Sequence, residues 1–150
     1  SKDEYERVLS RLEPLKELGA VDTSGLSQNT SERLAALVRQ VAASSIPFRE
    51  GTLDQEDAAR IGQLAKLLRE LEETAAKANT SYRYTLLAHP LIGTNRVANR
   101  LIEERRATQV RLQLVQGGLA PERFETRLSE DLDRAGQGVT VVPVEAPGEE

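Results

Sequence analysis

The stretch LAHPLIGTNRVANRLIEERRATQVRLQLVQGG, residues 87–118, contains the pattern on which the fold assignment depends. It leaves a strand-like run, passes a loop marked by Pro90 and Gly93, and continues as a helix from about Asn95 to Gln116 that ends at Gly117-Gly118. Five residues of this helix follow one another at four-residue steps of about 40° and so share one face: Ala98, Ile102, Arg106, Val110 and Leu114. Arg106 therefore stands near the middle of a face that is otherwise apolar.

Arg106 has two interpretations. In the first it binds a ligand, because Asn99 lies seven residues earlier, about 10 Å along the axis, and helical side chains lean toward the N-terminus and the loop 90–94. The free N–H groups and the positive dipole at that helix end suit a carboxylate or another small anion. In the second, Arg106 makes an internal salt bridge or extends to the surface along its aliphatic stem. Spacing alone does not separate the two.

The flanking residues predict alternating strands and helices. Residues 46–49 indicate a short strand, and Thr52 to Gln55 fit a capping box that opens a helix with Ile61, Leu64 and Leu68 on its apolar side. Strands are expected at 81–88, 123–129 and 139–145. The order from residue 46 onward is β-α-β-α-β-β, which predicts a two-layer α/β sandwich.

The ends of the chain are expected to lie outside this sandwich. Residues 1–45 indicate a helix at 3–18, a turn over Gly19–Gly25 with a brief strand at 20–23, and a second helix capped by Asn29 or Thr30. We interpret them as a helical extension or the end of a preceding small α/β module, whose apolar stripe (Leu34, Leu37, Val38 and Val41) packs on the following domain or on a second copy. Residues 46–145 form the main domain, and residues 146–150 are expected to be disordered.

The composition excludes several classes of function. A net charge of −4 argues against a general affinity for nucleic acid. With no cysteine and one histidine, disulfides, thiolate metal sites and multi-histidine zinc sites are excluded. The sequence has neither a phosphate-binding Gly-rich loop nor a nucleophile elbow, so we expect no catalytic residues, metal or cofactor.

The same residues resemble the central signature of the OmpA-like (outer membrane protein A C-terminal-like) peptidoglycan-binding domains. That signature reads G-H-T-D, a nearby Gly, N-x-x-L-S-x-x-R-A, and then V-x-x-x-L and a Gly. His89 matches the His, Asn99 the Asn, and Arg106-Ala107 the Arg-Ala, with no insertion between them. The resemblance extends over residues 46–145 and implies an OmpA-like domain with an N-terminal helical extension.

The resemblance also implies a function. OmpA-like domains bind the diaminopimelate of the peptidoglycan stem peptide, and the Asp and Arg of the signature hold its amino-acid end. Asn99 and Arg106 are then expected to bind this ligand, with His89, Leu91 and Thr94 at the pocket rim. His89 is expected to be structural, as a lone histidine at a strand end commonly is. Glu103 and Glu104 are expected on a solvated helix face.

The chain departs from the signature where it matters for binding. Leu91 stands where the family has its Asp, Pro90 replaces the preceding Thr, and Gln137-Gly138-Val139 lacks the basic residue that often begins the last strand. Residues 128–132 replace the Gly-rich turn after the third strand. Loss of a desolvated charged partner costs about 2–5 kcal/mol, so affinity in the usual mode is expected to fall by orders of magnitude.

Two functions follow as expectations. The first is a non-catalytic domain of the bacterial cell envelope, in the periplasm, that docks on peptidoglycan with weakened or altered specificity and anchors a membrane-attached parent protein to the cell wall beneath the outer membrane. The alternative is a degenerate OmpA-like domain for protein–protein interaction or self-association, with an envelope protein or a second copy as partner. Leu91 at the pocket favours the alternative, and the retained Asn99 and Arg106 favour the first.

Overall fold

The order of helices and strands predicted from residue 46 onward is confirmed by the structure, a computed structural model that describes the backbone of residues 13–146 and the side chains of residues 28–146. Part of the predicted helix 3–18 and most of the predicted tail 146–150 lie outside the described residues. The elements are α2 (Glu13–Ala43), β1 (Ser45–Ile46), α3 (Gln55–Lys77), β2 (Tyr82–Ala88), α4 (Arg96–Gln116), β3 (Phe124–Leu128) and β4 (Val139–Glu145). Two 3-10 turns, η1 (Pro121–Arg123) and η2 (Leu132–Arg134), flank β3.

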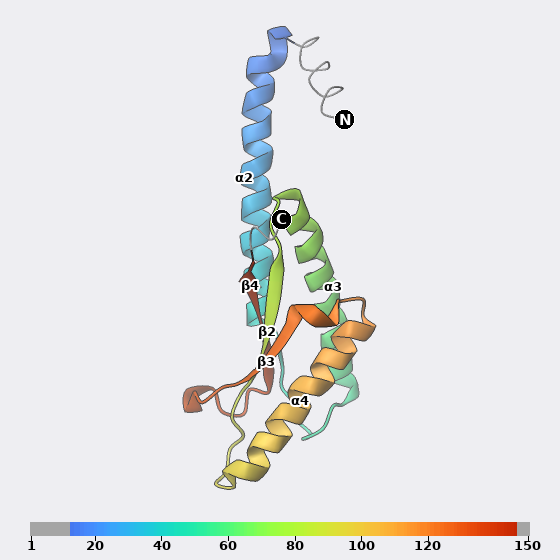
Figure 1. The fold of residues 1–150 in the computed structure, drawn as a ribbon, viewed down its shortest axis with the longest axis vertical. Coiled ribbons are helices and arrows are strands. Elements are labelled where there is room, and N and C mark those ends of the chain that lie inside the picture. The colour runs from blue at the N-terminus through green and yellow to red at the C-terminus, as the bar shows by residue number, and fades with distance from the viewer. Residues whose placement is uncertain (1–12, 147–150) are drawn as a thin grey trace.

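The strands form one four-stranded sheet in the order β1-β4-β2-β3. β4 pairs antiparallel with β1 and with β2, and β2 pairs parallel with β3. Burial alternates along β2, where Tyr82, Tyr84, Leu86 and Ala88 are buried and the residues between them are exposed or half-buried. One face of the sheet therefore carries the core beneath the helices, as the predicted two-layer α/β sandwich requires (Figure 1).

The C-terminal part of α2 belongs to the same hydrophobic core as the rest of the domain. Leu37 and Val41 are fully buried together with Leu68 of α3 and Leu86 of β2. Arg33 of α2 also forms an ion pair with Glu70 of α3. The apolar stripe predicted for this helix thus packs on the following domain, one of its two expected partners, and Figure 1 shows α2 running alongside β4.

The turn predicted over Gly19–Gly25 and the brief strand at 20–23 are wrong, because α2 continues through them without a break. A glycine inside a helix costs only about 1 kcal/mol, which a cooperative helix tolerates. Pro14 lies in the first turn of α2, where its missing N–H breaks no intrahelical bond. No helix among the described residues is long and apolar enough to cross a membrane.

Two boundaries near β1 also differ from the predictions. The strand predicted over 46–49 ends at Ile46, and Phe48 adopts a positive φ of 51°, so the chain turns away from the sheet there. The capping box of α3 is formed by Asp54 and Asp57 instead of Thr52 and Gln55. The Asp54 carboxylate accepts from the Asp57 backbone N–H at 2.8 Å, and the Asp57 carboxylate accepts from the Asp54 N–H at 3.3 Å. A carboxylate accepts these bonds more strongly than a hydroxyl and also favours the positive helix end.

Candidate functional site

A small pocket lies where the chain leaves β2 and enters α4. Its volume is about 40 Å³. The lining comes from the loop after β2, the first two turns of α4, the end of β3 and η2: Pro90, Leu91, Gly93, Arg96, Asn99, Arg100, Glu103, Ser129 and Leu132. Asn95 fixes the start of α4, because its side-chain oxygen accepts from the Ala98 N–H at 3.2 Å.

Glu103 is the one charged residue of this lining whose side chain is almost fully enclosed, with 4% of the residue exposed. Its Oε2 accepts a hydrogen bond from the Leu91 backbone N–H at 2.9 Å, so it ties the loop to α4. The prediction that Glu103 lies on a solvated helix face is wrong, whereas Glu104 is exposed as predicted. The buried side of α4 runs through Glu103, Arg106, Val110 and Leu114. The spacing of three residues between Glu103 and Arg106 was the signal that sequence reasoning missed.

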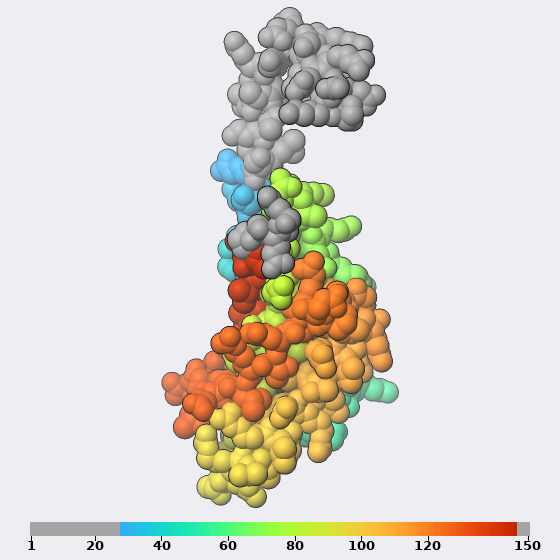
Figure 2. Space-filling model, viewed as in Figure 1, coloured from blue at the N-terminus to red at the C-terminus, as the bar shows by residue number. Residues whose placement is uncertain are grey.

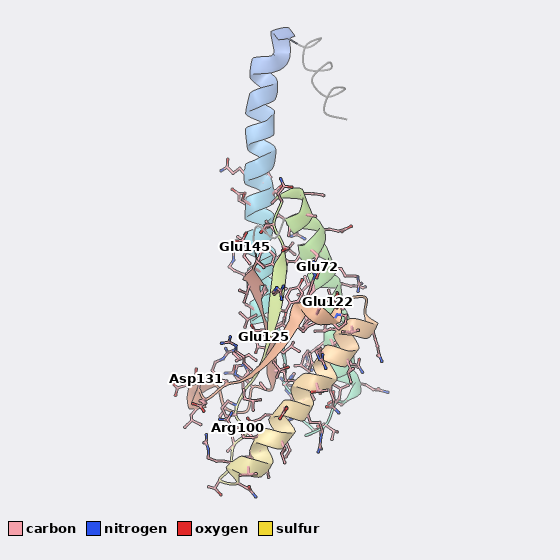
Figure 3. The ribbon with its side chains drawn as sticks, viewed as in Figure 1. Glu72, Arg100, Glu122, Glu125, Asp131 and Glu145 are labelled. Carbon is pink, nitrogen blue, oxygen red and sulfur yellow. The ribbon has the colours of Figure 1, made fainter. Side chains whose placement is uncertain are left out.

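The mouth of the pocket is polar and cationic. Asn99 lies against the loop, because a Cβ built on Gly93 would stand 3.7 Å from the Asn99 Nδ2. Arg96 is exposed, and Arg100 pairs with the exposed Glu130 at 2.9 Å. Figure 3 shows Arg100 at the end of the molecule where α4 begins and where Asp131 also lies. The pocket therefore offers donors for an anionic group at its mouth and a carboxylate at its inner wall.

Arg106 is buried on the apolar face of α4 as predicted, but it does not line this pocket. Its Nη2 donates to the Gly51 carbonyl at 3.3 Å, and its guanidinium carbon lies 5.0 Å from the centre of the Phe48 ring. The guanidinium thus contacts the connection between β1 and α3, away from the loop 90–94 toward which it was expected to point. The reason is tertiary: this connection folds back over α4 and supplies both an acceptor and an aromatic face.

Two carboxylates, those of Asp57 and Glu103, act on the buried positive charge of Arg106. Burial lowers the pKa of its guanidinium, while the negative charges of Asp57 and Glu103 oppose that shift. Asp57 is itself 1% exposed, and its Oδ1 lies 3.6 Å from Arg60 of the same helix. The Arg106 Nε is buried without a hydrogen-bond partner. Arg106, Asp57 and Glu103 therefore form an internal polar cluster that joins α3 to α4.

The three residues predicted at the pocket rim, His89, Leu91 and Thr94, do not lie together in the structure. His89 is 2% exposed, its Nε2 lies 2.8 Å from the Thr140 Oγ1, and its backbone N–H donates to Gly138 at 2.8 Å. Burial lowers the pKa of His89, the charge of Arg134 lowers it further, and Asp131 opposes these effects. His89 thus joins the end of β2 to β4, which agrees with the structural role predicted for it. Leu91 is half-buried in the pocket lining, and Thr94 is exposed outside it.

These dimensions define a class of site. A water molecule needs roughly 10–15 Å³ of such space, so the pocket of about 40 Å³ has room for a few water-sized groups. Sites for small molecules usually measure about 300–1,000 Å³. Among residues 28–146 no group of three His, Asp or Glu side chains is placed to hold a metal ion. The fold and site together describe a small α/β domain with a shallow polar pocket where β2 leads into α4.

Comparison with known proteins gives several similar structures, two of which follow. No protein-family model and no curated protein matches the chain. The OmpA-like domain of FopA1 from Francisella tularensis subsp. tularensis SCHU S4 is similar with a TM-score of 0.48 and 16% identity, over 69% of this chain and 70% of that one. The C-terminal domain of Helicobacter pylori MotB (residues 125–256) is similar with a TM-score of 0.42 and 14% identity, over 66% of this chain and 78% of that one. At these identities the likeness concerns the course of the backbone and says nothing of a ligand.

Proposed function

We propose that the chain is a non-catalytic domain of the bacterial cell envelope that docks on peptidoglycan in the periplasm with altered ligand specificity. The support comes from the residues that resemble the OmpA-like signature. Asn99 matches the Asn of that signature and lies in the pocket beside the loop 90–94. The order of strands and helices is the one that the resemblance predicted.

The observation that carries the proposal is the presence of Asn99 and Glu103 in one pocket. Leu91 replaces the Asp of the signature, which removes a carboxylate from the loop. Glu103 stands at the position of the signature Ser, and it brings a carboxylate to the same loop from the helix side, bonded to the Leu91 N–H. We propose that Glu103 takes over the contact with a ligand ammonium group and that Asn99, Arg96 and Arg100 receive an adjacent carboxylate.

In this proposal Arg106 supports Glu103 from outside the pocket lining. Its buried positive charge interacts with the negative charges of Glu103 and Asp57 and so supports the enclosed carboxylate of Glu103. A direct contact between Arg106 and the ligand remains a prediction, since it requires the guanidinium to leave Gly51 and Phe48.

Retention on purified sacculi tests the proposal. Wild-type protein is expected to sediment with sacculi, and Asn99→Ala and Glu103→Gln are expected to weaken retention by about tenfold each, which corresponds to roughly 1.4 kcal/mol. Glu104→Gln, the exposed neighbour with the same change of charge, is the matched control and should bind as wild type. Retention of Asn99→Ala and Glu103→Gln at the wild-type level, or no retention of wild type, would contradict the proposal.

A second candidate is docking on an envelope protein, and one observation favours it. Several large apolar side chains of the loop 90–94, of α4 and of η2 are exposed by 61–82%: Ile92, Val97, Leu101 and Leu132. Peptidoglycan offers little apolar surface to cover them, whereas a protein partner can. If Ile92→Ser and Val97→Ser leave sacculus retention unchanged but abolish binding to an envelope extract in which wild type is retained, the second candidate is preferred.

A further inference from the structure

β3 lies at the edge of the sheet, and within residues 13–146 its only neighbouring strand is β2. The Ser129 N–H donates to the Ala88 carbonyl at 2.8 Å, at the end of the parallel pairing between these strands. Because backbone groups alternate in direction along a strand, the N–H and C=O groups of Thr126 and Leu128 and the C=O group of Phe124 point away from β2. The Phe124 N–H donates to the Pro121 carbonyl. No strand among the described residues pairs with the Phe124 C=O or with the N–H and C=O groups of Thr126 and Leu128, which form an open row along the outer side of β3.

This edge is accessible. Glu125, Thr126 and Arg127 are all exposed. Thr126 is paired with Leu86, which is fully buried, yet Thr126 is exposed, so α4 leaves the middle of β3 uncovered although it packs nearby. Figure 2 shows this orange segment at the surface, and Figure 3 places Glu125 on β3.

The five residues of β3, Phe-Glu-Thr-Arg-Leu, are complementary to themselves in an antiparallel arrangement. With Thr126 on a two-fold axis, Glu125 stands opposite Arg127 of a second copy, and Phe124 stands opposite Leu128 of that copy. We propose that a second copy of this chain pairs with β3 in this register, which joins the two sheets into one. This interface goes beyond the proposed function and does not depend on it.

The backbone fits the same register. A two-fold axis at Thr126 pairs Thr126 with itself and Phe124 with Leu128. The two Thr126 residues exchange both of their outward bonds, and the Leu128 N–H of each copy donates to the Phe124 C=O of the other, because the Phe124 N–H is bonded to Pro121. Glu125 and Arg127 then occupy the non-hydrogen-bonded positions, where opposite side chains approach most closely. In the single chain these two side chains pair with each other at 2.9 Å, so each exchanges its internal partner for the equivalent residue of the second copy.

Charges commonly protect an exposed edge from pairing. Here the two charges have opposite signs and are placed symmetrically about Thr126, so they repel most strands but attract this one. Such an isologous contact closes after two copies and does not continue into a fibre. The contact is therefore selective for the same chain.

A charge exchange between two variants tests the interface. Sedimentation velocity of the wild-type chain at increasing concentration should show a dimer with twice the monomer mass of 16.5 kDa. Glu125→Arg and Arg127→Glu should each raise the dissociation constant by roughly tenfold or more, because like charges then face each other twice. An equimolar mixture of the two variants restores opposite charges at both positions and should again form dimers.

Two further variants separate this contact from other kinds of self-association. Thr126→Pro removes an outward N–H without removing a bond to β2, so it should abolish dimers, whereas Thr126→Val should retain them. Glu104→Arg, on the exposed side of α4, is the matched charge control and should dimerise as wild type. A monomer at every concentration, dimers that persist in Glu125→Arg, or a variant mixture that remains monomeric would each overturn the proposal.

Discussion

At the scale of the residue, the buried charges of α4 connect the loop 90–94 to the rest of the domain. The Glu103 carboxylate accepts a hydrogen bond from the Leu91 N–H. Glu103 also lies one helical turn from Arg106, whose guanidinium contacts Gly51 and Phe48. Burial of Arg106 was predictable from its place on an apolar face. Its partners were not, because Gly51 and Phe48 precede it by more than fifty residues and meet it only in the folded chain.

Replacement of Glu103 by alanine should destabilise the domain. The substitution leaves the Leu91 N–H without its acceptor and removes a negative neighbour of the buried Arg106, for an expected loss of about 1–3 kcal/mol. Urea unfolding of Glu103→Ala against Glu104→Ala measures the effect, and the exposed control should stay within about 0.5 kcal/mol of wild type. Equal stabilities of the two variants would show that Glu103 has no structural role.

His89 should make the stability depend on pH. Its pKa in the folded chain is lowered below 6.5 by burial and by Arg134, so the unfolded chain binds more protons as the pH falls through 6.5. The contribution of the neutral imidazole is therefore complete above that pH and is lost as the pH falls below it. The urea midpoint should decrease more between pH 7.5 and pH 5.5 for wild type than for His89→Gln. The opposite order would contradict the assignment.

At the scale of the element, the start of each capped helix depends on which side chain reaches the free N–H groups of its first turn. The sequence predicted that a helix opens near residue 52, and periodic apolar residues identified its buried side correctly. The sequence pattern favoured Thr52 as the cap, although an aspartate such as Asp54 caps helices at least as well. The choice between them depends on where the chain turns after β1, and the positive φ of Phe48 shows that this turn is not a local property of the cap residues.

The cap of α3 can be tested with a pair of variants. Asp54→Ala removes one side of the reciprocal capping bonds and should destabilise the domain by about 1 kcal/mol. Thr52→Ala, at the position that the sequence pattern favoured, should change the free energy of unfolding by less than about 0.5 kcal/mol. Thermal or urea unfolding compares the two, and a larger loss for Thr52→Ala would restore the original cap assignment.

At the scale of the whole molecule, α2 and the sheet share one core, although the sequence suggested a division near residue 45. The division of the chain into 1–45 and 46–145 remains a prediction, since its N-terminal part lies outside the described side chains. What the sequence could not indicate is the partner of the stripe on α2, because amphipathic periodicity identifies an apolar side but not the surface that covers it. Contacts between α2, α3 and β4 supply that surface.

Truncation of a core side chain in α2 should therefore unfold the entire domain more easily. Leu37→Ala removes a fully buried side chain and should cost about 2–5 kcal/mol. Gln40→Ala on the exposed side of the same helix is the control, with an expected change below about 0.5 kcal/mol. A single urea transition shifted as a whole is expected. A separate early transition confined to helical signal would show instead that α2 folds independently.

The position of β4 has a consequence for biosynthesis. This strand is the last of the sheet to be made, yet it lies between β1 and β2. A ribosome that translates at roughly 5–20 residues per second exposes α2, α3 and α4 before residues 139–145 have left the exit tunnel. The nascent chain consequently keeps its apolar strand faces open until late in synthesis, so it should engage holding chaperones for longer than a domain whose central strand is made first.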